Sequence, residues 1–310
     1  MNTKTFTNEL NTGIKFSNSP IDYFILLKPR VMSLVVFTAF VGYFVGLFEN
    51  VDRLNPILAT IGIFAIAIGA GASGVLNQWY ERDIDSIMER TKNRPIPSKK
   101  IDPSEALTFG IILSFISIII LGLAVNWFSS LLLAFTIIFY AVIYTVLLKR
   151  STIQNIVIGG ASGAFPPVIG YSLINGNISL EALLLFGIIF LWTPPHFWAL
   201  ALLRQNEYKL ANIPMLPVVY GEKITRKYIL YYVLLLIPFS LLPFALGYSS
   251  LVYFSASILL GFEFLRRTHA LMKVKTNSEN KLFLFSITYL FVLFLSCLLY
   301  TSPSPRDRRL

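Results

Sequence analysis

The sequence predicts an all-α, polytopic membrane protein built as a bundle of nine transmembrane helices. Charged residues make up only 14% of the chain, where a soluble domain averages about 25%. Apolar residues of the AVILMFWYC set make up 55%, and the mean hydropathy is +0.67. They form uncharged stretches of 18 residues or more, whereas a membrane barrel would alternate over segments of about ten residues. These observations exclude a soluble or disordered chain and favour helices over strands.

The uncharged stretches give the order of the spans, because about 20 residues cross the apolar core of a bilayer as a helix. The eight stretches are residues 31–48, 56–80, 106–126, 127–148, 151–180, 182–203, 228–262 and 282–302. The seventh stretch is too long for one helix, and Gly247-Tyr248-Ser249-Ser250 marks a break inside it. The predicted number of spans is therefore nine.

Positive charge is concentrated on one face of this predicted bundle. Because consecutive loops alternate between the two faces, the N-terminal segment and four of the loops share a face that carries 22 of the 26 Lys and Arg residues. Cytoplasmic loops carry such an excess, so we expect a cytoplasmic N-terminus and a location in the cell (inner) membrane. We attribute the net charge of +10 to this orientation and not to nucleic-acid binding.

The chain divides into three predicted parts. Residues 1–30 form a cytoplasmic segment without the apolar run of a cleaved signal peptide, and residues 31–296 form the membrane domain. Residues 297–307 resemble the translation of a common transposase-library sequencing adapter, and they contain Cys297, the only cysteine. The alternative is a genuine polar tail that closes the ninth helix. We expect residues 297–310 to be non-native and assign them no function.

Four of the 16 acidic residues lie between Glu81 and Glu89, where the second span meets the cytoplasmic face. If the helix continues, Asn77, Glu81 and Asp85 follow one another at intervals of four residues on one helix face. An amide and two carboxylates suit Mg²⁺, which usually takes one or two carboxylates and completes its shell with water and phosphate oxygens. The single cysteine excludes a cysteine-based metal centre.

Cations lie among these acids. Arg82, Arg90, Lys92 and Arg94 would suit phosphate oxygens that the metal does not hold. The pattern predicts a site for Mg²⁺ and a diphosphate. The alternative is a solvated loop whose charges pair with one another, but a polar Asn77 one turn inside the span argues for a site.

A second polar cluster ends the sixth span. It consists of residues 192–198 (WTPPHFW), and Arg204 and Glu207 follow it. We expect the two prolines to distort the helix. His196 is either a hydrogen-bonded packing residue or a ligand. The loop after this span emerges on the same face as the acidic loop, so both are expected to cap one cavity that opens to the cytoplasm.

Several motifs resemble those of the UbiA-type intramembrane prenyltransferases, and most closely of the members that farnesylate protohaem IX. Residues 77–85 (NQWYERDID) and 88–95 (MERTKNRP) carry the main resemblance. It spans roughly residues 20 to 295. The further matching segments are residues 28–30 (KPR), 149–152 (KRST) with the glycines at 159 and 160, 195–200 (PHFWAL) and 212–217 (NIPMLP).

The resemblance implies an enzyme that transfers the farnesyl group of farnesyl diphosphate to a vinyl group of protohaem IX, giving haem O and diphosphate for terminal oxidases. It implies Mg²⁺ as cofactor, the lipid bilayer as surroundings, and a haem A synthase or a second copy of the chain as candidate protein partners. The implied roles are metal binding and catalysis for Asn77, Glu81 and Asp85, catalysis also for Arg90, diphosphate binding for Arg82, Arg90, Arg94, Lys149 and Arg150, haem binding for His196, and a second polar loop with Arg204 and Glu207.

Two departures from the family pattern bear on the substrate. Glu81 stands where the wider family usually has aspartate, which keeps the carboxylate. The second aspartate-rich motif of the quinone-pathway members is replaced here by His196 and Glu207, which argues for haem because imidazole is a familiar haem ligand. The alternatives are an aromatic prenyltransferase of quinone biosynthesis and, in another class, a membrane transporter, whose site would lie near the bilayer midplane.

Overall fold

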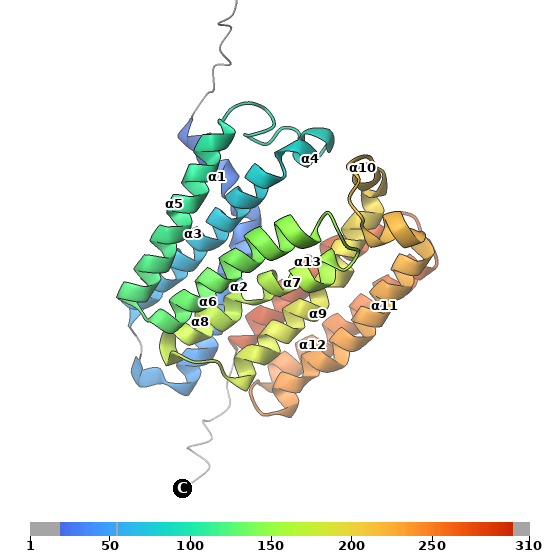
Figure 1. Cartoon of the computed structure of the whole chain (residues 1–310). Coiled ribbons are helices and arrows are strands. Elements are labelled where there is room, and N and C mark those ends of the chain that lie inside the picture. The colour runs from blue at the N-terminus through green and yellow to red at the C-terminus, as the bar shows by residue number, and fades with distance from the viewer. Residues whose placement is uncertain (1–18, 54, 300–310) are drawn as a thin grey trace, which may run out of the picture.

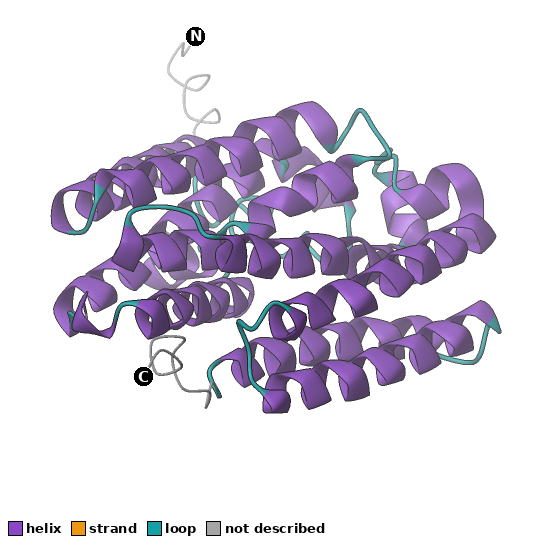
Figure 2. Ribbon diagram, turned by 90° about the horizontal axis from the view of Figure 1, so that it is seen from below, coloured by secondary structure: helices purple, strands orange, loops and turns teal. Residues whose placement is uncertain are grey.

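The computed structural model of the chain describes residues 19–53 and 55–299, which contain helices and loops and no strand (Figures 1 and 2). The ends of the chain at residues 1–18 and 300–310 lie outside the described residues. They include most of the predicted cytoplasmic segment and of the predicted non-native tail. The helices are α1 (Pro20–Leu26), α2 (Pro29–Glu49), η1 (Val51–Arg53), α3 (Pro56–Tyr80), α4 (Arg82–Ile87), α5 (Pro103–Ala124), α6 (Trp127–Ile138), η2 (Phe139–Leu148), α7 (Asn155–Ala164), α8 (Pro166–Asn175), α9 (Leu180–Leu203), α10 (Gln205–Leu210), α11 (Leu216–Ala245), α12 (Leu251–Met272) and α13 (Ser278–Cys297).

Many of these helices begin at residues that favour a helix start. Proline occupies the first position of α2, α3 and α5, where its missing N–H has no partner to lose. The side chain of Asn55 accepts hydrogen bonds from the first backbone N–H groups of α3, and Asp102 does so for α5. Local sequence therefore defines where several spans start.

Eight helical segments of the described chain are long and apolar enough to cross a membrane, which makes this a multi-pass membrane protein. The predicted break at residues 247–250 is confirmed, because α11 ends at Ala245 and α12 begins at Leu251. Helix α12 is also long, with 22 residues, but it is not among the eight candidate membrane spans. It carries Glu263, Arg266 and Arg267 in its second half.

Three spans differ from simple continuous α-helices, and one of them is α11, which is kinked at Gly221, where φ is 80°. The predicted fifth stretch consists of α7 and α8, which meet at Phe165 before Pro166. The fourth span changes from α-helix to π-helix at Phe139. Pro194 and Pro195, where a distortion is predicted, do not end α9, which continues as one helix of 24 residues through both.

Helices α2 and α8 cross with their backbones in contact. A Cβ atom at Gly42 would lie 2.0 Å from the carbonyl oxygen of Pro167, and one at Gly170 would lie 1.9 Å from that of Ala39. Small residues allow such an approach between membrane helices. The crossing fixes α2 in the bundle, and with it the loop before α2.

The short helices α4 and α10 lie at the same end of the bundle (Figure 1). They follow α3 and α9, the helices that carry the two polar clusters of the sequence. The two polar loops therefore share one end of the molecule, as the alternation of the spans predicts.

Candidate active site

Asn77, Glu81 and Asp85 lie together where α3 gives way to α4. Helix α3 ends at Tyr80, so the helix does not continue without interruption. The spacing of four residues nevertheless survives, because the backbone N–H of Glu81 donates to Asn77 (3.0 Å) and that of Asp85 donates to Glu81 (2.8 Å). The three side chains are 3%, 1% and 2% exposed. The turn thus buries an amide and two carboxylates side by side.

Each of these three side chains is held by a cation. Lys28 Nζ donates to Asn77 Oδ1 over 2.8 Å. Lys149 Nζ donates to Glu81 Oε2 over 2.6 Å, and Arg94 donates to Asp85 Oδ2 over 2.7 Å. The cations come from three separate segments: the loop before α2, the end of η2 and the loop after α4.

Lys28 is the site residue that sequence reasoning missed. The sequence places it in the family-like segment 28–30 and among the cations that the orientation of the protein explains, and neither observation assigned it a role in the site. Its contact with Asn77 joins residues 49 positions apart. Desolvation lowers the pKa of Lys28 to about 7, and nearby Arg94 acts in the same direction. The signal in the sequence was its place directly before Pro29, where α2 begins.

The π-helix η2 forms another wall of the site. The backbone N–H of Lys149 donates to the carbonyl of Tyr144, five residues earlier, over 2.9 Å. Tyr140 and Tyr144 stack with ring centroids 5.3 Å apart. Thr145 accepts a hydrogen bond from the amide of Asn77 over 3.1 Å. Such π-helical segments often occur at functional sites, but nothing in the apolar run of residues 139–148 predicts one.

The charge of Lys149 is affected by residues of both polar loops. Burial alone would lower the pKa of Lys149, but Glu81 beside it and Tyr208 on α10 raise it, and the net direction is upward. Tyr208 is itself buried. On the same helix, Glu207 accepts from Arg204 over 2.8 Å, while its other carboxylate oxygen, Oε2, is buried without a hydrogen-bond partner.

The remaining predicted diphosphate residues lie on the exposed flank of α4. Arg150 forms two hydrogen bonds with Asp83, of 2.8 and 2.7 Å, which lower the pKa of Asp83. Arg82 donates to the backbone of Trp79. Arg90 is exposed, and in the described part of the chain no hydrogen bond or ion pair engages it. The structure therefore brings Arg94 and Lys149 to the buried carboxylates, but not Arg82 or Arg150.

His196 is packed between α9 and α13. Its ring stacks on Trp192 and Phe283, with centroid separations of 4.4 and 4.7 Å. Its Nδ1 lies 2.7 Å from the hydroxyl of Ser286, and the residue is 9% exposed. These contacts fit a hydrogen-bonded packing residue. They also fit a ligand-binding residue, because Nδ1 is engaged by Ser286 and Nε2 is the nitrogen left for a ligand.

The residues at the break after α3 fit a magnesium ion that arrives with phosphate oxygens. No group of three or more His, Cys, Asp and Glu able to hold a metal occurs among the described residues. Asn77, Glu81 and Asp85 instead offer two carboxylates and an amide, and these three side chains are buried next to one another. Mg²⁺ commonly binds through so few protein ligands, because substrate phosphates and water complete its shell.

Residues 35–300 match the model of the UbiA prenyltransferase family. The chain belongs to this family. It is 54% identical over 278 residues to protoheme IX farnesyltransferase 2 of Mesorhizobium japonicum, covering 88% of this chain and 87% of that protein. It is 53% identical over 278 residues to protoheme IX farnesyltransferase of Brucella anthropi, covering 88% of each. The family resemblance of the motifs is thereby confirmed.

Solved structures of the family share the fold. A structure described as digeranylgeranylglyceryl phosphate synthase matches with a TM-score of 0.75 at 18% identity, over 90% of this chain and 97% of that one. A UbiA homolog from Archaeoglobus fulgidus bound to DMAPP and Mg²⁺ matches with a TM-score of 0.67 at 16% identity, over 89% and 99%. At this identity the likeness establishes the helical architecture alone.

Proposed function

We propose that this protein transfers the farnesyl group of farnesyl diphosphate to a vinyl group of protohaem IX, giving haem O and diphosphate. The observation that carries the proposal is the buried set Asn77, Glu81 and Asp85, each facing a cation, at the end of the bundle that holds both polar loops. The relatives that are identical at more than half of the aligned residues are named protoheme IX farnesyltransferases, which supports the same transferred group and the same acceptor.

The residues of the site have different proposed roles in the reaction. Asn77, Glu81 and Asp85 would hold Mg²⁺, which when bound offsets the negative charge of the diphosphate. Arg94 and Lys149 are placed to stabilise the departing diphosphate as the bond to the allylic carbon breaks. The haem vinyl group then supplies the electron pair for the new carbon–carbon bond. Water adds to the resulting haem-side cation and loses a proton, which leaves a hydroxyl group on the product.

The surroundings of the site suit a carbocation. The stacked pair Tyr140 and Tyr144 lies beside Lys149, whose Nζ is 6.0 Å from the ring centre of Tyr144. Aromatic faces attract cations, so these rings would favour an allylic cation near the diphosphate. The apolar helices limit access of water to it. His196 is the proposed haem residue, through the nitrogen that Ser286 does not engage.

We also propose the orientation and the partners of the protein. The excess of Lys and Arg on the face of the polar loops supports a cytoplasmic N-terminus, a cavity that opens to the cytoplasm, and a place in the cell inner membrane. Helix α12 is the proposed ninth span. Haem A synthase or a second copy of the chain is the proposed protein partner, and crosslinking in membranes followed by mass spectrometry would identify either.

One experiment tests the reaction directly. The chain is expressed in a host that lacks haem O, and the extracted haems are identified by mass. We expect haem O to appear, and its absence from cells that contain the folded protein would overturn the proposal. In a parallel assay, membranes receive farnesyl diphosphate with either haem or 4-hydroxybenzoate. Prenylated 4-hydroxybenzoate without haem O would assign the protein to quinone biosynthesis instead, and uptake of a substrate without turnover would indicate a transporter.

A further inference from the structure

The side chain of Lys28 reaches into the active site from the loop between α1 and α2. Its aliphatic part runs along α3 at Gly74, where an added Cβ would lie 3.5 Å from Lys28 Cδ. Its Nζ ends at Asn77 Oδ1, one turn further along α3. Lys28 as a whole residue is partly exposed, while its ammonium group lies at the buried amide of Asn77.

The backbone at Lys28 adopts a conformation that lysine rarely takes. Its φ is 54° and its ψ is 56°, in the left-handed region, which costs a residue with a Cβ about 1 kcal/mol or more. The backbone N–H of Lys28 donates to Ile25 over 3.0 Å. Strain of this kind persists where the surrounding structure holds it, and here it directs the side chain inward.

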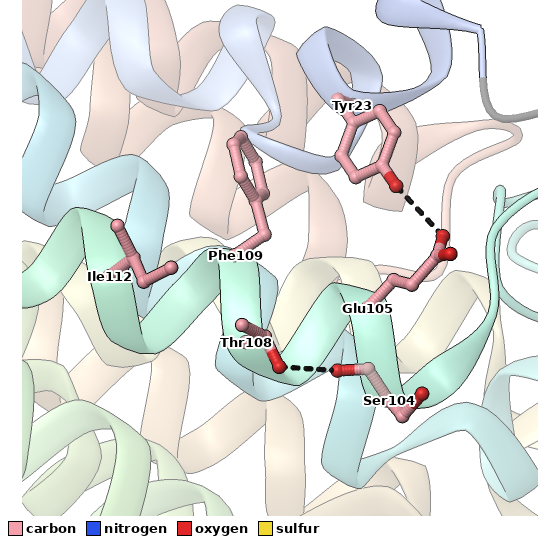
Figure 3. Close-up of a pocket in the computed structure, with 6 residues that line it drawn as sticks. All are labelled: Tyr23, Ser104, Glu105, Thr108, Phe109 and Ile112. Carbon is pink, nitrogen blue, oxygen red and sulfur yellow. Dashed lines mark hydrogen bonds between the residues drawn. The ribbon is translucent and has the colours of Figure 1, made fainter.

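Both sides of this loop are anchored. Tyr23 of α1 donates to Glu105 over 2.9 Å and its ring packs edge-on against Phe109, in the pocket shown in Figure 3. Gln78 donates to the carbonyl of Leu26 over 2.6 Å. On the other side, α2 is fixed by its crossing with α8. The position of Lys28 is therefore set by contacts that do not involve its own charge.

The charges around the three candidate ligands do not balance. Arg94 and Lys149 each pair with a carboxylate, whereas Lys28 pairs with the neutral amide of Asn77. Three cations thus face two carboxylates. An ammonium group removed from water without a counter-ion is unfavourable, and a complex of Mg²⁺ with a prenyl diphosphate is an anion that would supply one.

Asn77 is arranged so that it can release Lys28 without turning. Its amide nitrogen donates to Thr145 over 3.1 Å, and Thr145 in turn donates to the carbonyl of Tyr140 over 2.8 Å. These bonds hold the side-chain amide of Asn77 in place. Its oxygen would therefore stay directed at the site after Lys28 has moved.

We propose that Lys28 is a diphosphate-binding residue that donates to Asn77 in the substrate-free protein and moves to the diphosphate when the substrate enters. The move exposes Asn77 Oδ1 to the metal, so that diphosphate and metal bind together. This inference rests on the proposed function, because it takes the prenyl diphosphate as the ligand of this site.

The test uses the purified full chain and two probes. Calorimetry measures binding of farnesyl thiodiphosphate, a slowly reacting analogue, in the presence of Mg²⁺. Electron paramagnetic resonance measures binding of Mn²⁺ alone. The variant Lys28→Met keeps the aliphatic arm and removes the charge. Lys99→Met is the matched control, because Lys99 also has a left-handed backbone, with φ of 58°, but is exposed.

We expect Lys28→Met to bind the analogue roughly ten- to hundredfold more weakly, the size of a lost charge-assisted hydrogen bond. It should bind Mn²⁺ alone as well as the wild type or better, because Asn77 Oδ1 is free. Lys99→Met should match the wild type for both probes. Unchanged analogue affinity in folded Lys28→Met would overturn the inference, and so would an equal loss of both probes, which indicates a structural role.

The outcome for the wild type separates this inference from the proposed function. If the wild type does not bind the analogue, the proposed function fails. If the wild type and Lys99→Met bind it and Lys28→Met binds it equally, only the role of Lys28 fails. Should Lys28→Met not fold, Lys28→Gln retains a donor for Asn77 without the charge and is expected to lose analogue binding in the same way; retained binding would overturn the inference.

Discussion

Lys149 Nζ lies 2.5 Å from Glu81 Oε1, although the two residues are 68 positions apart in the chain. Their side chains are 14% and 2% exposed, so the pair joins the end of η2 to the break after α3 in a largely dry environment. In such surroundings each member depends on the other, because a buried charge without a partner is strongly unfavourable.

This dependence predicts how the pair responds to substitution. Lys149→Met is expected to lower the free energy of unfolding by about 3 kcal/mol, because Glu81 is left buried and unpaired. The double variant Lys149→Met/Glu81→Gln should recover much of that loss. Thermal unfolding in detergent would measure both, and losses that simply add would show that the pair is not coupled.

Glu81→Asp keeps the carboxylate and should reduce farnesyl transfer less than Glu81→Gln does.

Asp85→Asn should reduce farnesyl transfer by at least about a hundredfold, because it removes a carboxylate from the candidate metal set. Haem binding, followed by the Soret band, should survive. Asp83→Asn is the matched control, since Asp83 lies two residues away but is exposed and pairs with Arg150. We expect Asp83→Asn to stay within about threefold of the wild type. A folded Asp85→Asn protein that fails to bind haem would contradict the assignment.

The sequence alone could place the two carboxylates and Asn77 near one another, but it could not predict which cations contact them. Asn77, Glu81 and Asp85 lie within nine residues, and their spacing of four is kept across the break after α3 by local backbone hydrogen bonds. Lys28 and Lys149 reach them across 49 and 68 residues, and such contacts depend on how whole helices pack. Likewise, the break between α11 and α12 follows from chain length, whereas the continuity of α9 through Pro194 does not follow from proline's usual effect on helices.

His196→Ala should shift the haem Soret band or weaken haem affinity while leaving the Mg²⁺ dependence of the reaction unchanged. The reason is that His196 lies on α9 against α13, bonded to Ser286, and away from the carboxylates on α3 and α4. Ser286→Ala frees Nδ1 but keeps the imidazole, so its effect should be smaller. An unaltered haem spectrum in His196→Ala would leave the histidine as a packing residue.

Gly42→Ala should strongly reduce the amount of folded protein in membranes, because its Cβ would overlap the backbone of Pro167. Gly163→Ala is the control. Nothing lies within 4 Å of a Cβ at Gly163, and alanine favours a helix over glycine by about 0.5–1 kcal/mol. Equal yields of the two variants would show that the α2–α8 crossing is more tolerant than its geometry indicates.

We expect the sequence of the locus, read again from unfragmented DNA, to differ from the present reading frame after about Ser296. The resemblance of residues 297–307 to an adapter motivates this expectation, and most of those residues lie outside the described structure. A continuous frame through the eleven codons would make the tail native.

The π-helical register of η2 makes this part of the protein sensitive to length as well as to composition. Its backbone hydrogen bonds reach five residues back instead of four, as from Lys149 to Tyr144, and in this register Thr145 meets Asn77 while Lys149 meets Glu81. Loss of one codon between residues 139 and 143 would either tighten this segment to an α-helical register or turn the preceding helix relative to Lys149. We therefore expect a one-residue deletion here to reduce farnesyl transfer more than a conservative substitution at the same position does.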